Sequence, residues 1–138
     1  MSLEIPVEGN NFSAAGEAAS RVKKTLLRLG IDSQLVRRVA IATYEAEMNM
    51  VIHSDGGKII LQVDEEEIKV QAVDQGRGIS DLELAMKEGY STAPDEVREM
   101  GFGAGMGLPN IKKCADRLEI KSVVNEGTTV VMGFKYQP

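Results

Sequence analysis

The order in which strand-like and helical patterns follow one another constrains the fold of this chain more than any other feature. Residues 3–8 alternate apolar and polar side chains, as a short edge strand does. Two stretches with helical spacing follow, at residues 13–29 and from residue 33 to before Asp55. Two alternating runs, 58–63 and 68–73, are then separated by four acidic residues. This last pattern predicts a β-hairpin.

The second half of the chain begins with a long irregular stretch and also ends in a pair of strand patterns. Residues 76–107 contain one weak helical segment, 81–88, and otherwise glycine, serine, proline and charged residues. A connection of this length inside a compact domain is usually functional and often a lid. A helix at 108–118 and two strands, 119–124 and 128–136, are expected to close the chain.

The two halves together predict the fold class. Strands and helices come in pairs here, not in the strict alternation that builds parallel sheets. We therefore expect an α/β two-layer sandwich, with a mixed, mostly antiparallel sheet covered by helices on one face. Because the 138 residues show no internal repeat and no break in composition, a single domain covering residues 1–138 is expected.

Local residues predict where the first two helices begin and end. Ser13 is a plausible N-cap of the first helix, and Gly30 suits its C-terminal stop. Asp32 or Ser33 is expected to cap the second helix, because both side chains can accept a hydrogen bond from a backbone amide.

Charge and composition argue against several classes of function. A net charge of −5 does not suit a nucleic-acid surface, which needs clustered Lys and Arg. The apolar runs are far shorter than the roughly 20 residues that span a bilayer, and the N-terminus lacks the features of a signal peptide. One Cys and one His can form neither an internal disulfide nor a zinc site. We expect a cytoplasmic protein that binds neither nucleic acid nor membrane.

Glu45 and Asn49 lie four residues apart in the second predicted helix and therefore share one face. The carboxylate can accept a proton, and the amide oxygen can coordinate a hard cation such as Mg²⁺. A solvated Glu beside a chance Asn is the alternative. Glu47 points about 200° away from Glu45 on a helix, so we do not include it in the candidate site.

Asp74 ends an apolar strand and is followed by Gly76 and Gly78. A carboxylate there suits the exocyclic amine of a ligand, and the glycines admit a flat ring, although an ordinary strand-end turn uses the same residues. Thr128 begins the last predicted strand. Its hydroxyl could help to hold a purine ring, or the residue could simply suit a strand because it is β-branched.

Residues 101–108 read GFGAGMGL, with glycines on alternate positions before a predicted helix. Unpaired amides and the partial positive charge of a helix N-terminus suit a phosphate chain. The stretch is not a Walker A loop, because no Gly-Lys-Ser/Thr follows, and it is not a dinucleotide fingerprint, because no strand precedes it. Taken alone, the glycine pattern leaves the ligand open.

Taken in order, these motifs resemble the GHKL ATP-binding fold of gyrase, histidine kinases and MutL. The shared order is Glu-x-x-x-Asn, Asp-x-Gly-x-Gly, Gly-x-Gly-x-Gly at a helix start, and Gly-Thr before the last strand, over residues of about 10 to 136. The short length resembles that of bacterial anti-sigma factors and switch serine kinases. The local sequence at 74–80, 88–92 and 103–109 is most similar to the stressosome switch kinases of RsbT type.

This resemblance implies a role for each candidate residue, with ATP and Mg²⁺ as cofactors and an ATP lid at about 79–106. Glu45 matches the general base, Asn49 the Mg²⁺ ligand, and Asp74 the residue that reads the adenine amino group. The remaining ATP-binding matches are Gly76 and Gly78 beside the ring, Gly103, Gly105, Gly107 and Leu108 around the phosphates, and Thr128 on the adenine side.

The resemblance also implies a function. We expect an ATP-dependent serine/threonine protein kinase that phosphorylates a STAS-domain antagonist protein and regulates a sigma-factor or stress pathway by partner switching. A sigma factor or a PP2C-type phosphatase is a further candidate partner, and a homodimer is compatible with the resemblance. The alternative is an ATP-gated binding module that sequesters a sigma factor or phosphatase with little or no kinase activity. Residues 92–101 look longer and more acidic than in the stressosome kinases, which leaves the partner open.

Overall fold

A computed structural model describes residues 1–9, 12–53, 56–74, 107–123 and 127–136. The described elements follow in the order expected from the sequence. They are β1 (Ser2–Glu8), a 3₁₀ turn (Phe12–Ala14), α1 (Glu17–Arg28), α2 (Ser33–His53), β2 (Gly56–Val63), β3 (Glu67–Asp74), α5 (Gly107–Cys114), β4 (Arg117–Val123) and β5 (Gly127–Lys135). The weak helix expected at 81–88 and the lid expected at 79–106 lie outside these ranges.

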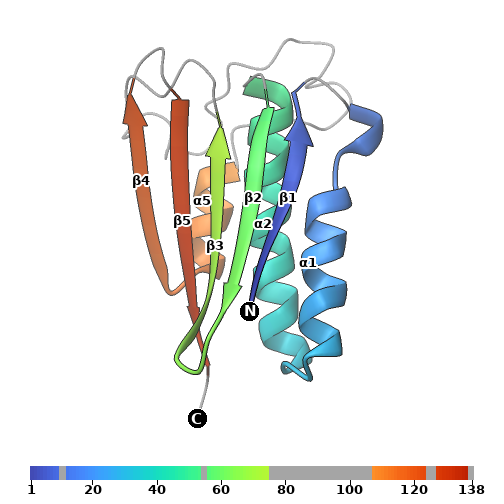
Figure 1. The fold of residues 1–138 in the computed structure, drawn as a ribbon. Helices are drawn as coiled ribbons and strands as arrows, with labels where there is room; N and C mark the ends of the chain where they lie inside the picture. Colours follow the sequence, from blue (N-terminus) through green and yellow to red (C-terminus); the bar gives the residue numbers. More distant parts are fainter. Residues whose placement is uncertain (10–11, 54–55, 75–106, 124–126, 137–138) are drawn as a thin grey trace.

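The five strands form one sheet in the order β1-β2-β3-β5-β4, and all four pairings are antiparallel. Helices α1, α2 and α5 cover one face of this sheet (Figure 1). The two-layer α/β sandwich is therefore confirmed. β1 lies at one edge of the sheet, as expected from Pro6, which has no amide to donate to a further strand.

The core fills the space between the helices and the sheet. α2 packs against α1 on one side and α5 on the other, and it also contacts strands β1, β2, β3 and β5. Its central position places its side chains next to most other elements. The largest fully buried side chains come from both layers and include Leu26, Val39, Met50, Ile59, Ile68, Ile111 and Phe134.

The helix starts are partly as expected. Asp32 caps α2, because its Oδ2 accepts hydrogen bonds from the amides of Gln34 and Leu35 at 3.1 and 3.3 Å. The expectation for Ser13 is wrong: α1 begins at Glu17, and its N-cap is Gly16 in a left-handed conformation with φ 97°. A capping glycine has no side chain to accept the first amides of the helix, so the acceptor comes from elsewhere in the fold.

The helix expected at 108–118 is shorter in the structure, since α5 ends at Cys114 and β4 begins at Arg117. Leu118 pairs with Met132 of β5. The last residues of the helical pattern therefore belong to a strand in the structure. Arg38 of α2 closes the helix end, because its Nε and Nη2 donate to the Cys114 carbonyl oxygen at 3.0 and 2.8 Å. A cationic donor is a favourable partner for the C-terminal carbonyls of a helix.

Within the described ranges, no helix combines the length and the apolar character that crossing a bilayer requires.

Candidate functional site

The described candidate residues gather at one end of the sheet. Asp74 ends β3, Thr128 lies at the start of β5, and α5 begins at Gly107 and Leu108. Figure 1 shows these three element ends on the same side of the molecule, beside the C-terminal half of α2. That half of α2 carries Glu45 and Asn49. The other predicted residues, Gly76, Gly78, Gly103 and Gly105, lie outside the described ranges, so their roles stay predictions.

Asp74 and Thr128 are 54 residues apart in the chain and adjacent in the sheet. The Thr128 amide donates to Oδ1 of Asp74 at 3.0 Å. This contact continues the pairing of β3 with β5, in which Val73 lies opposite Thr129. Because Asp74 is half-buried and held by this hydrogen bond, its carboxylate has a fixed position. A fixed carboxylate suits recognition of a hydrogen-bond donor on a ligand.

Gly57 of β2 allows the backbone to pack tightly beside Asp74, its partner in the sheet. A Cβ at Gly57 would lie 2.8 Å from the Asp74 Cα and would also overlap the carbonyl oxygen of Val73. Gly57 is not among the site residues predicted from the sequence. The sequence feature that could have identified Gly57 is the pair of glycines at the start of the strand that lies opposite the candidate Asp74.

Glu45 is half-buried, and its Oε1 accepts a hydrogen bond from Nδ2 of Asn110 at 3.4 Å. Burial raises the pKa of Glu45, and the hydrogen bond from Asn110 offsets this rise only in part. A carboxylate with a raised pKa is a better proton acceptor near neutral pH. Asn110 is not among the residues predicted from the sequence, although its place in the first turn after the glycine run marks it as a neighbour of the site.

Asn49 follows Glu45 by four residues on α2 and is also half-buried. Among the described residues, no group of three or more His, Cys, Asp or Glu could hold a metal ion by itself. Mg²⁺ bound with a nucleotide does not need such a group, because phosphates and waters supply most of its ligands. One amide oxygen at this position, beside the expected phosphate site, therefore fits the donor set of a Mg²⁺–nucleotide complex.

The N-terminus of α5 is the described part of the expected phosphate site. The first amides of a helix have no partner within it and carry a partial positive charge. α5 begins at Gly107, at the same end of the sheet as Asp74, and is eight residues long. This placement suits an anionic group between the start of α5 and the end of β3.

Glu47 has a structural role that differs from that of Glu45. It is 2 % exposed, and its carboxylate accepts three amide hydrogen bonds at the start of α1. Oε2 accepts from Gly16 at 3.0 Å and from Ala18 at 3.1 Å, and Oε1 accepts from Ala19 at 3.0 Å. Glu47 therefore supplies the negative cap that Gly16 cannot provide, and its carboxylate is directed to the start of α1.

Comparison with known proteins finds a family model and several relatives that agree with one another. The model of the histidine kinase-like ATPase domain matches residues 11–134. An anti-sigma F factor of Clostridium beijerinckii is 30% identical, over 99% of this chain and 94% of that protein. The serine/threonine-protein kinase RsbT of Bacillus subtilis is 33% identical, over 74% of each.

Two solved structures share the fold at low identity. A chain of the SiaB–SiaC complex from Pseudomonas aeruginosa matches with a TM-score of 0.63 and 12% identity, over 96% of this chain and 88% of that chain. The mycobacterial sensor histidine kinase MprB matches with a TM-score of 0.58 and 16% identity, over 100% and 99%. At these identities the likeness shows the common fold.

Proposed function

The chain belongs to the histidine kinase-like ATPase domain family, and from this membership we propose that it is an ATP-dependent serine/threonine protein kinase of the anti-sigma or switch type. Its relatives include anti-sigma F factors and the kinase RsbT. The observation that carries the proposal is Glu45, a half-buried carboxylate whose pKa burial raises, one turn from Asn49 and in contact with α5. A proton acceptor at that place is what phosphoryl transfer to a hydroxyl requires.

In the proposed function, the described residues bind and orient the nucleotide. Asp74 accepts a hydrogen bond from the exocyclic amine of adenine, while Thr128 holds the Asp74 carboxylate through its amide. The first amides of α5 bind phosphate oxygens, and Asn49 contributes an oxygen ligand for Mg²⁺. When bound, Mg²⁺–ATP would supply the γ-phosphoryl group, and the metal would neutralise its negative charge.

Glu45 acts on the acceptor protein in this proposal. It takes the proton of the serine or threonine hydroxyl while the new O–P bond forms and the bond from the γ-phosphorus to the β–γ bridging oxygen breaks, which releases ADP. Asn110 positions this carboxylate, because its Nδ2 donates a hydrogen bond to Oε1. We also propose a single domain over 1–138 with an ATP lid at about 79–106, which the family match over residues 11–134 supports.

We propose a STAS-domain antagonist protein as the substrate, in a cytoplasmic partner-switching pathway. The two kinds of relatives support this choice, since one kind is named for sigma factors and the other for serine/threonine kinase activity. A sigma factor or a PP2C-type phosphatase is the corresponding second partner. The anti-sigma names of several relatives also favour the alternative function, an ATP-gated binding module. Glu45 favours the kinase, because a module that only binds needs no general base.

The test is phosphoryl transfer with purified proteins. The chain is incubated with γ-labelled ATP, Mg²⁺ and each STAS-domain protein of its own genome, and labelled acceptor is counted. Glu45→Gln should lower transfer by at least about 100-fold, which is the contribution of a general base, and should leave ATP binding within about two-fold of wild type. Glu65→Gln, an exposed change in the β2–β3 turn, is the matched control. Full transfer by Glu45→Gln would overturn the base, and ATP binding with no labelled acceptor would favour the binding module.

A further inference from the structure

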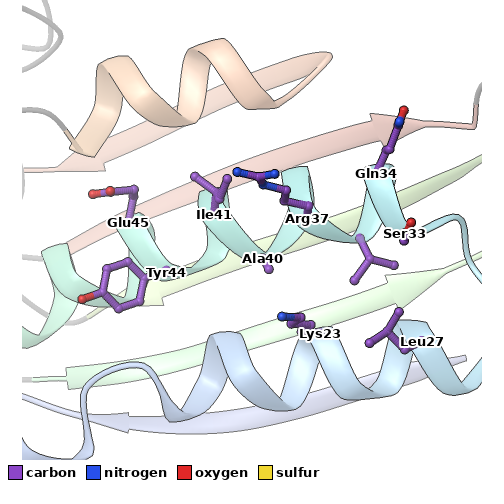
Figure 2. A pocket seen from close by; sticks show the side chains of 10 residues that line it. Lys23, Leu27, Ser33, Gln34, Arg37, Ala40, Ile41, Tyr44 and Glu45 are labelled. Atoms are coloured by element: carbon purple, nitrogen blue, oxygen red, sulfur yellow. The ribbon is translucent and has the colours of Figure 1, made fainter.

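A groove of about 740 Å³ lies between α1 and α2, and Figure 2 shows the sheet behind these helices. Lys23 and Leu27 of α1 line one side, and α2 provides the rest of the lining. The groove gathers exposed apolar side chains. Of the five large hydrophobic residues that are exposed in the described part of the chain, three line it: Leu27 (47%), Ile41 (40%) and Tyr44 (39%). A concentration of this kind on one surface indicates a binding site for another molecule.

The shape of the groove suits a helix. Arg37, Ile41 and Glu45 line it at spacings of four residues, so they form one ridge of α2. From Ser33 to Glu45 is twelve residues, about 18 Å at 1.5 Å per residue, or slightly more than three helical turns. An amphipathic helix of three turns could lay its apolar face along this length.

The charge around the groove selects the kind of partner. Lys23 and Arg37 line it from opposite sides, and Glu45 at its end is the one acidic side chain of the lining. α1 carries four basic residues and one acidic residue, although the whole chain has a net charge of −5. Two copies of the chain paired symmetrically through this groove would bring the same basic surfaces together, which disfavours a second copy as occupant. An acidic partner helix is complementary to this surface.

The groove ends at Glu45, the proposed general base. A segment that lies in the groove therefore continues directly to the place where the acceptor hydroxyl must lose its proton. We propose that the α1–α2 groove is the docking surface for an acidic amphipathic helix of the partner protein, an inference that rests on the proposed kinase function. Apolar residues of that helix contact Leu27, Ile41 and Tyr44, and its acidic residues contact Lys23 and Arg37.

The test measures binding and phosphoryl transfer separately. The full chain is titrated by calorimetry with each purified STAS-domain protein of its own genome, with ATP and Mg²⁺ present. Ile41→Asp should weaken binding by at least about 10-fold, since it places a charge against the apolar face of the partner helix. Leu29→Asp is its matched control, because Leu29 is 48% exposed and lies outside the groove. Arg37→Glu should weaken binding about 5-fold or more, with Lys121→Glu on β4 as control.

The outcomes separate this proposal from the kinase assignment. Weaker binding by the groove variants alone, with a charge reversal on the partner helix that rescues Arg37→Glu, supports the docking surface even where no phosphate is transferred. Transfer and binding that stay at wild-type level in both groove variants would overturn the docking surface and leave the kinase standing. Failure of every STAS-domain protein to bind would also overturn the proposed docking surface. A change from dimer to monomer in Ile41→Asp, with partner affinity unchanged, would assign the groove to a second copy and overturn the proposal.

Discussion

Replacing Glu47 with alanine tests how the start of α1 is held. The change removes the acceptor of three amide hydrogen bonds, and two of those amides, Ala18 and Ala19, belong to buried residues. A buried donor left without an acceptor costs about 1–3 kcal/mol, so the two buried amides together account for about 4 kcal/mol. That is a large part of the roughly 5–15 kcal/mol by which a domain is stable. We expect Glu47→Ala to lower the free energy of unfolding by about 4 kcal/mol.

The measurement is urea unfolding followed by far-UV circular dichroism, with the midpoint and the slope fitted together. Glu47→Gln should lose about half as much stability, because its amide retains one acceptor oxygen but no charge. Glu45→Gln is the matched control on the same helix, and it should stay within about 1 kcal/mol of wild type, since Glu45 is half-buried with one long contact. A loss below about 1 kcal/mol in Glu47→Ala would refute the role of this carboxylate as the cap of α1.

Four further changes probe the site and its supports. Asp74→Asn should weaken ATP binding at least about 10-fold in a fluorescent-nucleotide titration, while unfolding is little changed because the amide oxygen still accepts from Thr128. Gly57→Ala should lower stability by more than about 2 kcal/mol, because its Cβ overlaps the neighbouring strand. Because burial raises the pKa of Glu45, phosphoryl transfer should decline, as pH falls, earlier than for an ordinary Glu, and Glu45→Gln should lack this limb. Hydrogen bonds from the Lys135 amide and, to a lesser extent, from Arg38 lower the pKa of Asp116. The ionised Asp116 carboxylate therefore stabilises the fold above about pH 3.9, and this stabilisation is lost in stronger acid. In strong acid, the stabilities of Asp116→Asn and wild type should converge.

Each of these four predictions has a result that would contradict it. Wild-type nucleotide affinity in Asp74→Asn would remove this residue from the adenine site. An unchanged unfolding midpoint in Gly57→Ala would show that β2 can shift without penalty. The same acid limb in wild type and Glu45→Gln would assign the titration to another group, and a stability difference for Asp116→Asn that persists in strong acid would exclude its carboxylate as the cause.

The sequence predicts most of the architecture, because periodicity reports which side chains face the core. The alternation in β2 and β3 and the cap at Asp32 are local signals, and the structure confirms both. The structure places Asp74 beside Thr128, and the roles of both residues remain predictions.

The features that could not be predicted depend on contacts between distant segments. Glu47 caps amides 28 to 31 residues away, and nothing in its local pattern shows this. The same applies to Asn110, which reaches Glu45 over 65 residues. The end of α5 was predicted too late because pairing with β5 outweighs the helical periodicity of residues 115–118.

Because Arg38 holds the C-terminal end of α5, a tilt of this helix around that end moves its N-terminal end most. Its Cys114 end is tied to α2 at 3.0 and 2.8 Å. Its eight residues span about 12 Å, so a tilt of about 10° around Cys114 displaces the Gly107 end by about 2 Å. Asn110 lies about halfway along and moves by about 1 Å, which is enough to break or shorten its 3.4 Å hydrogen bond to Glu45. An anion that displaced the start of α5 would therefore also change the orientation of the Glu45 carboxylate, at about half the displacement.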